Sequence, residues 1–130
     1  MNKFIIADSA GFCFGVSRSV DMANEILGRE GGCYCLGQLI HNDDVVRSLE
    51  EKGMKVVDEP EQVPEGATVM IRSHGVPKAV YAALEARNAV IADATCPKVM
   101  RIHKIVKKAS EQGRTVVIIG MKHHPEVEAI

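Results

Sequence analysis

The chain has 130 residues, of which 46% are hydrophobic, 25% charged and 4% aromatic, and its formal net charge is −1. This length suffices for one domain with a real core, or for one domain and part of another. The small net charge and the scarcity of aromatic residues argue against a nucleic-acid surface or a base-stacking platform. No apolar run is long enough for a membrane span or a signal sequence, so we expect a cytoplasmic protein with reduced thiols.

Short apolar runs alternate with helical periodicity along the chain, which predicts an α/β fold with a small parallel sheet flanked by helices. The predicted strands are 3–8, 33–37, 55–57 (at an edge), 67–72, 89–92 and 115–119. The predicted helices are 16–27, 43–52, one opened by Pro77 and one from Pro97 to Gly113. In the last helix the residues expected to face inward are Val99, Ile102, Val106 and Ala109.

One pattern occurs twice, at an offset of 83 positions. Cys13 lies 28 positions before His41, as Cys96 does before His124, and Gly37 and Arg18 recur at the same offset as Gly120 and Arg101. A repeat of this length indicates a repeated structural unit, and each copy carries a thiol and an imidazole. The second copy runs out shortly after its histidine, so we expect the chain to be a fragment of something larger.

Five residues that could do chemistry each follow a predicted strand: Cys13, His41, His74, Cys96 and His124. The carboxyl ends of parallel strands meet at one edge of a sheet, where open α/β folds bind ligands. We therefore expect these five side chains to form one site.

The two cysteines of the repeat, Cys13 and Cys96, each stand at the turn into a predicted helix. Free N–H groups and the helix dipole favour a thiolate there, which indicates metal ligation. Two thiolates do not complete a site: zinc could recruit nearby histidines, and an iron–sulfur cluster would need another cysteine. Cys33 and Cys35 point to one face of a strand and are predicted to be core thiols. A Cys13–Cys96 disulfide stays possible in air, but not as the functional state.

The histidines of this edge offer N–H donors that suit a phosphate or diphosphate. Glu126 follows His124 by two positions, beside a proline that fixes the backbone, and could pass protons to a bound substrate. His103 belongs to a lysine-rich helix and is expected to be solvated, while His123 simply flanks His124.

Five motifs in order carry a resemblance to a known family. They are Gly-Phe-Cys-x-Gly-Val at 11–16, Ile-His-Asn at 40–42, Ser-His-Gly-Val at 73–76, Asp-Ala-Thr-Cys-Pro at 93–97 and His-Pro-Glu-Val-Glu at 124–128. Together they resemble the N-terminal portion of the LytB/IspH family, the 4-hydroxy-3-methylbut-2-enyl diphosphate reductases.

The resemblance implies an enzyme of the non-mevalonate isoprenoid pathway. It would reductively remove a hydroxyl from its allylic diphosphate substrate, giving isopentenyl and dimethylallyl diphosphates, with ferredoxin or flavodoxin as electron donor. Cys13 and Cys96 would be two of three cysteines that hold a [4Fe–4S] cluster. His41, His74 and His124 would surround the diphosphate, and Glu126 would be the acid of the proton relay.

The resemblance also implies three similar α/β units with pseudo-threefold symmetry around a cavity. Residues 1–13 would be an N-terminal strand that packs with the third unit, 14–96 the first unit, and 97–130 the truncated start of the second. The third cysteine and a Ser/Asn group of the diphosphate site would lie in later sequence. We therefore expect these residues alone to hold no normal cluster and to be inactive, and exposed apolar faces make self-association plausible.

Two other interpretations stay open at this point. One is a non-catalytic zinc module built from Cys13, Cys96 and nearby histidines. The other is a plain phosphate-binding α/β domain whose cysteines are merely buried.

Overall fold

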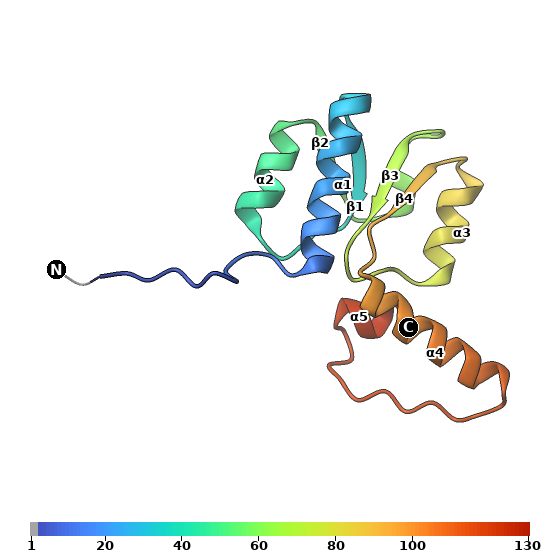
Figure 1. The fold of residues 1–130 in the computed structure, drawn as a ribbon. Helices are drawn as coiled ribbons and strands as arrows, with labels where there is room; N and C mark the ends of the chain where they lie inside the picture. The colour runs from blue at the N-terminus through green and yellow to red at the C-terminus, as the bar shows by residue number, and fades with distance from the viewer. Residues whose placement is uncertain (1–2) are drawn as a thin grey trace.

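The computed structural model describes residues 3–130, and its centre is a four-stranded parallel sheet (Figure 1). The elements in chain order are α1 (Phe14–Glu30), β1 (Cys33–Leu36), α2 (Asp43–Glu51), β2 (Met54–Val57), η1 (Pro60–Gln62), β3 (Thr68–Ile71), α3 (Lys78–Ala86), β4 (Val90–Asp93), α4 (Pro97–Glu111) and α5 (Pro125–Glu128). The strand order is β2-β1-β3-β4, and all three pairings are parallel. This confirms the predicted α/β fold, with β2 at an edge.

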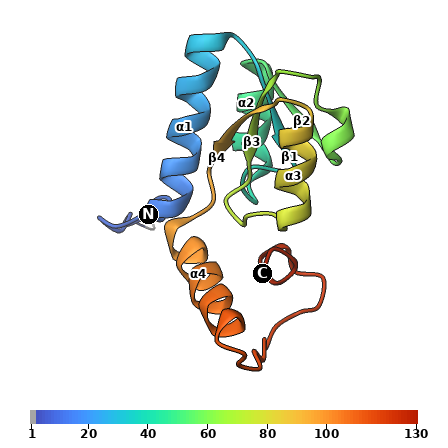
Figure 2. The same ribbon diagram turned by 90° about the vertical axis from the view of Figure 1, so that its right-hand side faces the viewer.

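The helices cover both faces of the sheet. Helices α1 and α2 lie on one face and α3 on the other (Figures 1 and 2). Side chains alternate between the faces along each strand. Cys33 and Cys35 pack in one cluster with Ala23 of α1 and Leu49 of α2, whereas Leu84 of α3 belongs to a second cluster. Both thiols are buried, which confirms their prediction as core residues.

Helix α1 is longer than predicted because its capping residues lie outside the apolar pattern. It begins directly after Cys13 and ends at Gly31, whose φ of 72° lets its N–H donate to the carbonyl of Leu27.

Pro77 has a different place from the one predicted. It is the capping residue before α3, and Lys78 is the first helical residue.

The predicted strands 3–8 and 115–119 are wrong: both segments are irregular. Their side chains face solvent, with Phe4 92% and Ile119 96% exposed. A strand is held by hydrogen bonds to a neighbour, and neither segment has such a neighbour among residues 3–130. Residues 1 and 2, which belong to the N-terminal segment expected at 1–13, lie outside the described residues.

Helix α4 leaves the sheet, and a long irregular segment returns from its end to the short helix α5 (Figure 1). The predicted inward face of α4 is only partly right. Val99 is buried, but Ile102 is 46% exposed because α4 projects away from the sheet. Of the helices described, none has the length and apolar content needed to cross a bilayer.

Candidate functional site

Three loops are tied together at the carboxyl edge of the sheet. The N–H of Ser73 donates to the carbonyl of Leu39 at 3.2 Å, and the N–H of Cys96 donates to the carbonyl of Ser73 at 2.9 Å. The ladder of β1, β3 and β4 thus continues past the ends of the strands. It brings the backbones near His41, His74 and Cys96 side by side.

The three histidines expected at this edge lie close together there, with His74 between the two histidines of the repeat. The ring centroids of His41 and His74 are 4.5 Å apart, and those of His74 and His124 are 6.3 Å apart in an edge-on arrangement. His74 is therefore the central ring of a trio that comes from three separate segments. His123, in contrast, is exposed and faces Glu128 at 3.2 Å.

The surroundings of the central ring favour its neutral form. Burial lowers the pKa of His74, and the charges of His41, Arg72 and His124 act in the same direction. The carboxylate of Glu126 raises the pKa of His74, which indicates that Glu126 lies close to the trio. A neutral imidazole donates one hydrogen bond, and the position of its proton decides where it points.

His124 has a defined tautomer whenever it is neutral. It is the capping residue of α5, and its Nδ1 accepts the backbone N–H of Glu126 at 3.3 Å. The proton of the neutral ring must then be on Nε2. The same bond fixes the backbone of Glu126 relative to the ring, and the Glu126 side chain is half-buried.

Arg72 joins the site, although the sequence did not single it out. Its guanidinium lies over Gly37, where an added Cβ would be 2.6 Å from Nη1, and its Nε donates to the carbonyl of Gly75 at 3.4 Å. Its position directly after β3, on the same edge as the histidines, was the available signal. With Arg72, the trio gains a permanent positive charge that suits an anion.

The turns that carry the two cysteines of the repeat both lie at the start of α1. Cys13 is the capping residue of α1 and Cys96 that of α4. A Cβ added to Gly15 would lie 2.6 Å from the Sγ of Cys96, so this sulfur rests on the first turn of α1. Both thiols are free, Cys13 exposed and Cys96 half-buried. These exposures contradict the interpretation of this pair as merely buried thiols.

Polar contacts fix the start of α1 against the segment that leads to Cys96. The buried Ser19 hydroxyl lies 2.9 Å from the carbonyl of Gly15 and 2.9 Å from that of Ala94. The Arg18 guanidinium reaches the carbonyls of Thr95 at 3.4 Å and Asp93 at 3.5 Å. The two sulfur-bearing turns are therefore held as one rigid surface.

This surface fits part of a metal or cluster site. Two thiols stand at helix N-termini, where thiolates are favoured, and Gly15 leaves room for the second sulfur. Within residues 3–130, however, no three His, Cys, Asp or Glu side chains are grouped so that they could hold a metal ion. A zinc site normally needs four ligands, so the residues described do not support the zinc module.

Comparison with known proteins gives the same family as the motifs. The chain matches the LytB protein family over residues 4–130. A 4-hydroxy-3-methylbut-2-enyl diphosphate reductase of Caldanaerobacter subterraneus subsp. tengcongensis is 43% identical, over 96% of this chain and 45% of that protein. One of Clostridioides difficile is 44% identical, with the same two coverages of 96% and 45%.

Solved structures agree with these relatives. The E-1-hydroxy-2-methyl-but-2-enyl-4-diphosphate reductase of Plasmodium falciparum superposes with a TM-score of 0.90 at 29% identity, over 94% of this chain and 39% of that one. A second structure, of an (E)-4-hydroxy-3-methyl-but-2-enyl diphosphate reductase, gives a TM-score of 0.83 at 44% identity, over 96% and 44%. The chain thus spans less than half the length of the relatives it matches. On this evidence of sequence and fold, the chain belongs to the LytB family.

Proposed function

We propose that the chain forms the N-terminal part of an iron–sulfur reductase that acts on 4-hydroxy-3-methylbut-2-enyl diphosphate. The reaction would take up two electrons and two protons, release the hydroxyl as water and give isopentenyl and dimethylallyl diphosphates. The observation that supports this most is the contact of three imidazoles on the sheet edge that also carries two helix-capping thiols.

In this proposal His41, His74 and His124 bind the diphosphate. The neutral His124 ring presents Nε2–H because its Nδ1 already accepts a backbone N–H. Arg72 adds charge beside Gly37 and His74. Charged hydrogen bonds of this kind contribute about 1.5–3 kcal/mol each, so loss of one should weaken binding by tenfold or more.

Cys13 and Cys96 would supply two thiolates to a [4Fe–4S] cluster, with a third from outside these 130 residues. When bound, the cluster would supply the electrons and a Lewis-acidic iron at the substrate hydroxyl. The chain's own part is to hold two sulfurs at the N-termini of α1 and α4, where the dipoles stabilise thiolate charge. A ferredoxin or flavodoxin of the cytoplasm is the electron donor we propose.

Glu126 is the proton donor that we propose for the departing hydroxyl. Its backbone is fixed by His124, its side chain is half-buried, and its charge acts on His74. A carboxyl group beside a neutral imidazole can take up a proton and deliver it to a bound substrate.

The arrangement of the chain in the whole enzyme is also a proposal. Residues 1–13 would pack with a third unit, 14–96 form the first unit and 97–130 begin the second. The exposed apolar side chains of the irregular segments, such as Phe4 and Ile119, support self-association of the isolated chain.

A chimera tests the proposed function. This chain would replace the matching 45% of the Clostridioides difficile relative, and reduction of the substrate would be measured anaerobically. We expect activity in the chimera, its loss in Cys13→Ser and Glu126→Gln, and retention in Cys33→Ser. A folded, iron-loaded chimera that never reduces the substrate would contradict the proposal.

The isolated chain should behave differently. After anaerobic incubation with iron and sulfide, we expect neither a stoichiometric cluster nor turnover, because only Cys13 and Cys96 are free thiols that reach the surface. A complete cluster together with reductase activity would refute this expectation.

A further inference from the structure

Three residues that carry buried polar atoms without a partner lie around one glycine. Within residues 3–130, the buried side-chain nitrogen and oxygen atoms without a hydrogen-bond partner in the protein are His74 Nδ1, Thr95 Oγ1 and His103 Nε2. Such atoms are rare, because a buried polar group without a partner costs about 1–3 kcal/mol. That all three belong to one neighbourhood calls for a common cause.

The common neighbour is Gly75, with φ of 80°. A Cβ there would lie 3.1 Å from His103 Cε1 and 3.3 Å from Thr95 Cγ2, and His74 is the preceding residue. In the His103 ring, Cε1 is bonded to Nε2, so the buried nitrogen is at the end that faces Gly75. The three unpartnered atoms thus lie on residues that converge from β3, β4 and α4.

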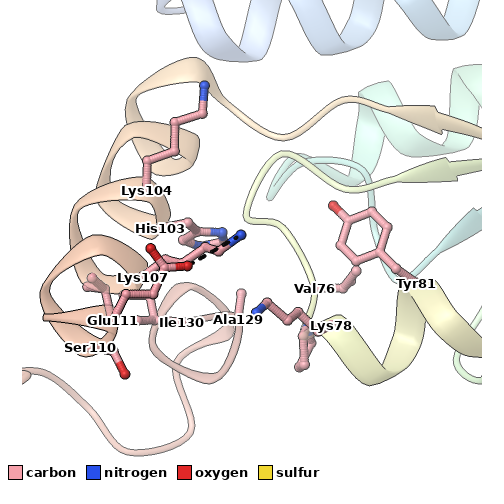
Figure 3. A pocket seen from close by; sticks show the side chains of 12 residues that line it. Val76, Lys78, Tyr81, His103, Lys104, Lys107, Ser110, Glu111, Ala129 and Ile130 are labelled. Atoms are coloured by element: carbon pink, nitrogen blue, oxygen red, sulfur yellow. Dashed lines mark ion pairs between the residues drawn. The ribbon is translucent and has the colours of Figure 1, made fainter. Parts of the chain in front are cut away.

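His103 reaches this place from α4, a helix rich in lysine. In Figure 3 its ring projects from α4 toward Val76 and toward Lys78 at the start of α3. Beside it is a cavity of about 500 Å³ between α3 and α4, which gives water a path to the ring. The backbone N–H of Thr95 donates a hydrogen bond to Asp93 Oδ1 at 2.9 Å, which fixes the position of Thr95. The hydroxyl of Tyr81 donates to Asp93 Oδ2, also at 2.9 Å.

The orientation of the His74 ring indicates what a hydrogen-bond donor to its Nδ1 would do. Its Nδ1 is buried, whereas its Nε2 is not among the buried unpartnered atoms and makes no hydrogen bond within residues 3–130. Nε2 is thus the nitrogen left to face the trio's open side. A neutral ring that donates from Nε2 has a bare Nδ1, and when Nδ1 is buried, a hydrogen bond that it accepts favours this tautomer. In His124 the N–H of Glu126 supplies this bond, and His74 has no equivalent backbone donor.

We propose that His103 is a positioning residue for His74: with the Thr95 hydroxyl it holds a buried water that donates to Nδ1 of His74 and keeps that ring's proton on Nε2. The water accepts from His103 Nε2–H and donates to His74 Nδ1 and Thr95 Oγ1, so all three atoms gain a partner. A site with three polar partners is typical of structural water. The consequence for binding the diphosphate rests on the proposed function, whereas the tautomer does not.

The test is the tautomer of His74 in the 130-residue chain labelled with ¹⁵N-histidine, read from long-range ¹H–¹⁵N spectra above the pKa of the ring. We expect a bare Nδ1 and a protonated Nε2. In His103→Phe the proton should be shared between the two nitrogens, and His103→Gln, whose amide can replace the Nε2–H donor, should restore the original state. The unchanged signal of His124 Nδ1 serves as the control that the variants fold.

Binding of inorganic diphosphate gives the second measurement. If the proton divides evenly in His103→Phe, the competent form falls to half and the apparent Kd rises about twofold. A His74 ring protonated on Nδ1, or one unchanged in folded His103→Phe, would overturn the inference. Should the tautomer respond as expected while diphosphate binds to no variant, the inference stands, and the proposed binding of diphosphate by the three histidines of this chain fails.

Discussion

The Sγ of Cys96 rests against Gly15, so close that a Cβ added to Gly15 would lie 2.6 Å from this sulfur. This contact joins the start of α1 to the start of α4 and puts the two sulfur-bearing turns side by side. It also explains why glycine stands two positions after Cys13, inside a helix where it is otherwise unfavourable.

Gly15→Ala should therefore destabilise the chain. The added methyl group must displace the Cys96 side chain, and overpacking of this kind costs about 1–3 kcal/mol of unfolding free energy. Gly28→Ala is the matched control, because Gly28 lies in the same helix with nothing within 4 Å of an added Cβ. The control should gain up to about 1 kcal/mol from helix propensity. Urea unfolding measures both, and equal effects of the two substitutions would contradict the contact.

The four thiols should react in a definite order with iodoacetamide. Cys13 is exposed and Cys96 half-buried, whereas burial raises the pKa of Cys33 and raises that of Cys35 to about 12. At pH 8 a thiol with that pKa is ionised to about one part in ten thousand, and only the thiolate reacts. Mass spectrometry of the native chain should find Cys13 modified first and Cys35 last, with all four modified in urea. Early modification of Cys35 would show that the sheet does not bury it.

Stability should fall with acid below the ordinary pKa of histidine, about 6.5. Since the folded pKa of His74 is lowered, the unfolded chain takes up its proton first as the pH falls. The contribution of His74 to the free energy of unfolding is fully present above pH 6.5. It is lost as the pH falls through the pKa of His74 in the folded chain. His74→Gln should reduce this slope in unfolding experiments across that window, and the exposed His123→Gln should not. Identical slopes for the two variants would count against a buried neutral His74.

Most of the fold could be predicted from local patterns, and the errors have one physical origin. The apolar runs at 33–36, 68–71 and 90–93 form strands because each finds a parallel neighbour. The runs at 3–8 and 115–119 have similar composition but no neighbour among the described residues. Strand propensity is local, whereas pairing depends on segments far away in the chain.

The site was predictable where the repeat marked it, and less so elsewhere. Cys13 and Cys96, one repeat apart, both cap helices, and the histidine trio forms even though the strands expected before Cys13 and His124 do not. The prediction that His103 is solvated is wrong, since its Nε2 is buried. Its spacing of four from Val99 and three from Val106 placed it on the inward face of the helix. That signal was outweighed by the surrounding lysines.

The most direct test of the account is a titration of the chain with inorganic diphosphate, followed by the ring signals of its five histidines. We predict that His41, His74 and His124 shift together along one binding curve while His123 stays fixed, and that Arg72→Ala weakens the binding by tenfold or more. Binding that leaves the trio unmoved, or that moves His123 instead, would contradict an anion site at the carboxyl edge of the sheet.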